Sequence, residues 1–112
     1  MLGDSQFHDP AGFNRLINDL VWLGPAFAIQ VGDMIKGYAG VEQVREEWLR
    51  FADQIRPLDA AGITFMPVPG NHDVLGAKRK PTKALKRVYE QTWGATYYGF
   101  EYGNSAFLVL NT

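Results

Sequence analysis

Two short apolar runs, each followed at once by glycine and polar residues, constrain the fold of this chain most strongly. Residues 26–31 form the first run and lead into Gly32-Asp33, and residues 63–68 form the second and lead into Pro69-Gly70-Asn71-His72-Asp73. The 38 positions from Asp33 to Asn71 leave room for one crossover helix, which predicts two parallel strands. The polar ends of both strands then lie at one sheet edge, where open α/β sheets bind ligands.

Helical patterns surround these two strands. Asp9 followed by Pro10 is typical of a helix start, and this first helix is expected to end at Gly24. Residues 41–61 carry the longest helical pattern, which Pro57 is expected to kink or split because proline lacks an amide hydrogen. The first helix is predicted to bury one apolar face, formed by Phe13, Leu16, Ile17 and Leu20.

The C-terminal part of the chain predicts one more helix and a hairpin. Residues 81–93 are amphipathic, and residues 97–102 and 105–110 are rich in aromatic and β-branched residues around Gly103-Asn104, a turn signal. The fold class is therefore α/β, with parallel strands, crossover helices and a following antiparallel hairpin. Pro67 argues against a central strand position, so regular pairing is expected to end at Met66. The tryptophans are expected in the core: Trp22, Trp48 and Trp93.

Charge and cysteine content exclude several classes of protein. Lys and Arg number 11 against 12 Asp and Glu, so the net charge of −1 gives no general attraction to nucleic acid or to a membrane surface. The absence of cysteine excludes disulfide scaffolds and thiolate metal sites. No apolar run approaches the roughly 18 residues that a membrane span needs. Six basic residues without an acid occupy positions 78–87, which we interpret as a solvated helix face, with proximity to an anionic substrate as the alternative.

The residue types at the strand ends suit a divalent metal. Carboxylate, amide and imidazole donors fit Mn, Fe or Zn better than calcium. Asp33 is the candidate for a bridging carboxylate between two ions. A third acid, Asp4, follows Gly3, and it would lie on the same edge if a strand preceded it.

These residues together resemble the calcineurin-like metallophosphoesterase superfamily. The resemblance rests on Gly32-Asp33 at the end of one strand and on Gly70-Asn71-His72-Asp73 at the end of the next, with the hairpin segment of residues 97–112 also similar. It implies a partial metallophosphoesterase sandwich, two divalent metal ions (Mn, Fe or Zn) and a phosphate-ester substrate. The implied function is that of a metal-dependent phosphoesterase, a hydrolase of phosphoric esters.

The resemblance also implies a role for individual residues. Asp33 would bridge the two ions, and Asn71 would coordinate the second one. His72 would stabilise charge on the phosphate or protonate the leaving oxygen, and Asp73 would hold the imidazole of His72 by a hydrogen bond.

The first motif of the family is usually Asp-x-His, whereas this chain reads Asp4-Ser5-Gln6. Asp4 and Gln6 are therefore the residues expected to bind the first ion. His8, two residues further on, is an alternative donor.

Two departures from the family pattern bear on the extent of the domain. Only Met1-Leu2 stands where the family has its first strand, and no histidine occurs after His72. We therefore expect residues 1–112 to be a single partial domain, the N-terminal half of the family's fold, inactive alone and completed by the remainder of a parent domain. The sequence assigns no compartment. The alternative function is a non-catalytic α/β binding or interaction module that keeps the scaffold.

Overall fold

Three parallel strands form the central sheet of the molecule, for which a computed structural model describes residues 1–7 and 9–111. They are β1 (Leu2–Gly3), β2 (Phe27–Val31) and β3 (Thr64–Val68), and β2 lies between the other two. Gly3 pairs with Val31 and Val31 with Val68, so all three strands end at the same edge. The first strand, β1, consists of Leu2 and Gly3 alone, and both residues pair with β2.

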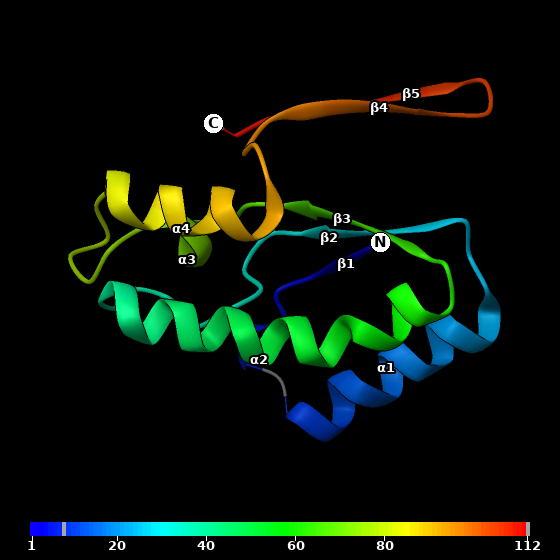
Figure 1. Cartoon of the computed structure of the whole chain (residues 1–112), viewed down its shortest axis with the longest axis horizontal. Coiled ribbons are helices and arrows are strands. Elements are labelled where there is room, and N and C mark those ends of the chain that lie inside the picture. The colour runs from blue at the N-terminus through cyan, green and yellow to red at the C-terminus, as the bar shows by residue number, and fades with distance from the viewer. Residues whose placement is uncertain (8, 112) are drawn as a thin grey trace.

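Two long helices pack below the sheet in the view of Figure 1. The first, α1 (Pro10–Leu23), begins at Asp9, whose side chain accepts from the Ala11 amide at 3.4 Å, and ends at a left-handed Gly24, as predicted. The second, α2 (Val41–Ala60), continues through Pro57, so the expected split of this helix does not occur. Pro57 removes one amide near the end of the helix, and its own carbonyl still accepts from the Ala61 amide at 3.1 Å.

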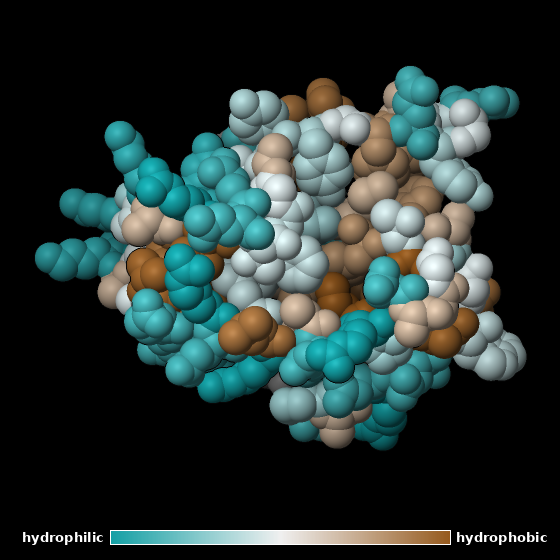
Figure 2. All heavy atoms as spheres, in the orientation of Figure 1, coloured by the Kyte–Doolittle hydropathy of each residue, from teal (hydrophilic) through white to brown (hydrophobic). Residues whose placement is uncertain are grey.

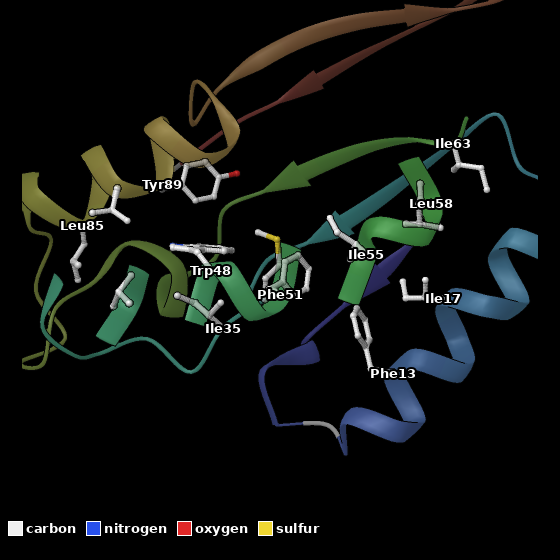
Figure 3. Close-up of a cluster of buried hydrophobic side chains, with 14 residues drawn as sticks. Phe13, Ile17, Ile35, Trp48, Phe51, Ile55, Leu58, Ile63, Leu85 and Tyr89 are labelled. Atoms are coloured by element: carbon white, nitrogen blue, oxygen red, sulfur yellow. The ribbon is translucent and has the colours of Figure 1, made fainter. Parts of the chain in front are cut away.

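Aromatic and aliphatic side chains fill the space between these helices and α4 (Lys83–Trp93), as Figure 3 shows. Trp48 of α2 is 2% exposed, and its ring lies 5.8 Å from that of Tyr89 on α4. Trp93 is partly buried against the same cluster. Trp22 is 86% exposed, which contradicts its expected place in the core. It follows the buried Ile17 by five positions, or about 140° around the helix, and so lies on the opposite face.

The hairpin covers part of the other face of the sheet. Its strands are β4 (Tyr98–Tyr102) and β5 (Ser105–Val109), antiparallel and joined at the predicted turn. Phe27 of β2 packs edge-on against three hairpin rings at centroid distances of 5.3–5.5 Å, those of Phe100, Tyr102 and Phe107. The fold is thus α/β with a parallel sheet and an antiparallel hairpin, as the sequence predicted.

Two smaller predictions, on the end of strand pairing in β3 and on the burial of Leu16, were wrong. Pro67 does lie in an edge strand, β3, but the pairing continues past it to Val68 instead of ending at Met66. Leu16 was predicted to lie on the buried face of α1, but its side chain is 41% exposed. The buried face of α1 therefore includes fewer residues than the apolar pattern predicted. Among the residues that the structure describes, no helix combines the length and the apolar character that crossing a membrane requires.

Candidate functional site

The ends of β2 and β3 are in direct contact. The Gly32 amide donates to the Val68 carbonyl at 2.8 Å, and a Cβ on Gly32 would lie 3.1 Å from the Gly70 Cα. A Cβ on Gly70 would lie 2.2 Å from Asp33 Oδ1, so only glycine lets the two loops approach this closely. The structure therefore brings together the Asp33 loop and α3 (Asn71–Val74), the short helix that carries Asn71, His72 and Asp73, as the strand spacing predicted.

Asp33 connects the loops that follow all three strands. Its Oδ1 accepts from the His72 amide at 3.1 Å, and its Oδ2 lies 3.5 Å from the donor Gln6 Nε2. The backbone carbonyl of Asp33 accepts from the Gln6 amide at 3.0 Å, which ties down η1 (Ser5–Phe7). Asp4 is exposed at the end of β1, on the same edge of the sheet. Both aspartates have a positive φ of 50°.

Gln6 carries an unpaired polar atom beside this carboxylate. Its Oε1 is buried and has no hydrogen-bond partner within the described residues, while its Nε2 faces Asp33. A buried amide oxygen without a donor is costly, and a cation is one ligand that would satisfy it. The alternative donor His8 lies outside the described residues.

Asn71 and His72 both contact Tyr38, a residue that the sequence analysis did not single out. The Asn71 side-chain amide donates to the Tyr38 hydroxyl, which leaves Asn71 Oδ1 as the group able to bind a cation. The His72 ring centroid lies 4.3 Å from that of Tyr38, and its Nδ1 lies 2.6 Å from the Lys36 carbonyl oxygen. The position of Tyr38 between Gly37 and Ala39-Gly40, just after the Asp33 motif, was the available sequence signal.

Asp73 is fully buried and binds backbone amides of both loops. Its Oδ1 accepts from Met34 at 2.9 Å and from Ile35 at 3.3 Å, and its Oδ2 accepts from Gly70 at 2.8 Å. Burial raises the pKa of Asp73 to about 7, although these three amide donors act in the opposite direction. Asp73 was expected to orient the His72 ring. Its carboxylate accepts from backbone amides on both sides of the contact, and the Lys36 carbonyl oxygen lies 2.6 Å from the ring Nδ1; the orienting role of Asp73 stays a prediction.

The basic residues of positions 78–87 lie on the surface next to this edge. Figure 2 shows hydrophilic side chains projecting from the end of the molecule where the loop before α4 lies. Positions 78–80 are in a turn and not on a helix face, so the predicted solvated helix applies to Lys83, Lys86 and Arg87 alone. An open groove of about 780 Å³ separates α4 from the β3 loop, with Gly70, Asn71, Lys83 and Lys86 among its lining residues.

The donors brought to this edge are two carboxylates and two amides, from Asp4, Asp33, Gln6 and Asn71. Such oxygen donors fit a hard divalent cation. Across residues 1–7 and 9–111, no group of three or more His, Cys, Asp and Glu side chains is arranged to hold a metal ion. The chain's described residues thus fit part of a cation site, and the two-ion centre stays a prediction.

Comparisons with known proteins give a consistent set of relatives. No protein-family model matches the chain. Over 88 residues it is 33% identical to "Serine/threonine-protein phosphatase CPPED1" of Rattus norvegicus and of Homo sapiens, and 34% identical to the protein of that name in Pongo abelii. These matches cover 79% of this chain and 27% of each relative, so the matched region spans about a quarter of the relatives' length.

Proposed function

Because the chain is related to the calcineurin-like metallophosphoesterase superfamily, we propose that it forms the metal- and phosphate-binding edge of a hydrolase that acts on phosphate esters. The printed names of its relatives support phosphoester hydrolysis as the reaction class and phosphorylated protein as the first substrate class to test. The observation that carries the proposal is the contact across the ends of β2 and β3, where Asp33 accepts the His72 amide at 3.1 Å.

Four residues would hold the cation: Asp4, Gln6, Asp33 and Asn71. A divalent cation bound there would neutralise phosphoryl oxygens and make a water molecule more acidic. Asp33 would lie at the centre of this group, since its carboxylate already contacts Gln6 and the His72 amide. A second ion would require ligands beyond these four residues.

His72 would act on the leaving group. The Lys36 carbonyl can only accept a hydrogen bond, so it places a proton on Nδ1, and Nε2 is the ring nitrogen that would act on the substrate. When the ring is charged, Nε2 carries the proton that the leaving oxygen takes up. The Tyr38 ring, packed against the imidazole, limits the orientations that His72 can adopt.

Hydrolysis of an aryl phosphate with Mn²⁺ by the full-length protein that carries this sequence tests the proposal. We expect Asp33→Asn and His72→Ala each to lower turnover by about 100-fold or more, with activity lost in EDTA and restored by Mn²⁺. Asp19→Asn, an exposed carboxylate on α1, is the matched control and should leave turnover unchanged. Undiminished turnover of Asp33→Asn would refute the proposal.

A non-catalytic binding module is the second candidate. It is favoured by Gln6 at the position of the usual histidine and by the partial donor set in the described part of the chain. Calorimetric titration of the full-length protein with Mn²⁺ separates the two candidates. Tight binding that Asp33→Asn abolishes supports the hydrolase, and the absence of binding supports the module.

A further inference from the structure

The ring of Tyr38 is a platform on which three segments of the chain meet. Its hydroxyl accepts from the Asn71 side chain, and its ring lies tilted against the His72 ring at 4.3 Å between centroids. The guanidinium carbon of Arg79 lies 5.2 Å from the centroid of the same ring, a cation–π distance. A cation, an imidazole and a side-chain amide are thereby grouped around one phenol ring.

Backbone hydrogen bonds hold Arg79 in a defined turn. The Gly76 amide donates to the Lys80 carbonyl at 3.0 Å, and the Arg79 amide donates to the Gly76 carbonyl at 2.8 Å. A bridge between Leu75 and Pro81 closes the base of this turn. Arg79 has a φ of 53° and Tyr38 a φ of 51°, a left-handed conformation that side-chain-bearing residues rarely adopt. The backbone conformation of Tyr38 and Arg79 therefore contributes to the position of both side chains.

Among the described residues, no acid forms an ion pair with Arg79. Within the described chain, the ion pairs involve other basic residues, among them Lys86 with Glu90 at 3.6 Å. A guanidinium presents a planar set of donors that matches two phosphate oxygens at once. Arg79, Asn71 and His72 all contact the same residue, Tyr38.

We propose that Arg79, positioned by Tyr38, is an anion-binding subsite that receives the phosphoryl group of the substrate beside His72. This inference deepens the proposed function and rests on it for the identity of the ligand. Among the basic residues at positions 78–87, Arg79 is the one that would bind the phosphoryl group. Tyr38 would be a positioning residue that holds Arg79 in place.

Titration of the isotope-labelled 112-residue chain with inorganic phosphate, followed by NMR with and without Mg²⁺, tests this subsite. We expect saturable shifts of the Arg79 Nε–H signal and of the Asn71 and His72 amides. Arg79→Ala should weaken phosphate binding by about tenfold, the lower end of the effect of a hydrogen bond to a charged group. Arg79→Lys keeps the charge without the planar donors and should restore only part of the affinity.

Two matched variants test how the subsite is built. Lys78→Ala removes a neighbouring charge without touching Tyr38 and should leave binding within about twofold, as expected for a screened surface charge. Tyr38→Leu removes the aromatic platform and should abolish the Arg79 Nε–H shift, whereas Tyr38→Phe retains it because the ring stays. Unaltered phosphate binding by Arg79→Ala, or an equal loss in Lys78→Ala, overturns the proposal.

This measurement also separates the subsite from the hydrolysis reaction. Phosphate binding that depends on Arg79, together with a full-length protein that does not hydrolyse aryl phosphate with Mn²⁺, would leave the subsite intact and refute the proposed function. Hydrolysis that depends on Asp33, with phosphate binding indifferent to Arg79, would refute the subsite alone.

Discussion

The loop that follows Asp33 runs so close to His72 that one methyl group should displace the site. A Cβ on Gly37 would lie 1.7 Å from the His72 carbonyl oxygen and 2.7 Å from its carbonyl carbon, and both are backbone atoms. Gly37 also has a φ of 58°. We expect Gly37→Ala to cost about 1 kcal/mol for the left-handed backbone. The forced backbone shift adds about 1–3 kcal/mol, typical of overpacking.

Gly62→Ala is the matched control for this change. Gly62 has a similar φ of 74°, but nothing lies within 4 Å of its added Cβ, so only the backbone cost of about 1 kcal/mol applies. Urea unfolding of both variants measures the difference, and amide NMR shifts of His72 and Asn71 report displacement of the loop. Equal destabilisation of the two variants, with unshifted His72 signals in Gly37→Ala, would refute the reasoning.

Three further predictions concern stability and are measured by urea unfolding of the 112-residue chain. Asp73→Asn should destabilise by about 1–3 kcal/mol, because its NH₂ group cannot accept from one of the buried backbone amides that the carboxylate now binds; an unchanged midpoint would contradict this. Trp48→Ala should cost about 3–5 kcal/mol, and Trp22→Ala, 86% exposed, should stay within about 0.5 kcal/mol; similar losses would show that the core is misplaced. Tyr89→Phe should lose about 1 kcal/mol with its hydrogen bond to the Pro67 carbonyl, and a more stable variant would argue against that bond.

The sequence pattern did not predict two details of the fold, the continuity of α2 through Pro57 and the exposure of Trp22. Pro57 was expected to kink or split α2, and the helix is not split: one missing amide near the helix end did not outweigh the burial of Leu58, which is 0% exposed, in the core. Trp22 is apolar yet faces outward, because composition alone does not tell which side of a helix meets a neighbour. Both differences arise from packing between elements and not from local propensity.

The hydrogen-bond partners of the candidate site residues were the part of the structure that the sequence predicted least well. The pairing of Asn71 with Tyr38 spans 33 positions, and that of Asp73 with the Met34 amide spans 39. Nothing in local spacing indicates such partners, and the pairing of Asp73 with His72 was only what the family resemblance implied. The sequence pattern placed Arg79 on a solvated helix, whereas the structure holds it in a turn over Tyr38.

The sequence by itself determined the order of the long helices α1, α2 and α4 and of the strands β2 to β5, and it brought the Asp33 and Asn71 segments to one edge. Apolar periodicity and glycine stops act locally, and a parallel crossover leaves its two strand ends at one edge. Only the tertiary structure decided which groups those loops bind: the backbone amides on Asp73, the Lys36 carbonyl on His72 and the ring beneath Arg79. These contacts depend on how far each loop extends across the sheet edge, which is set by packing among residues distant along the chain.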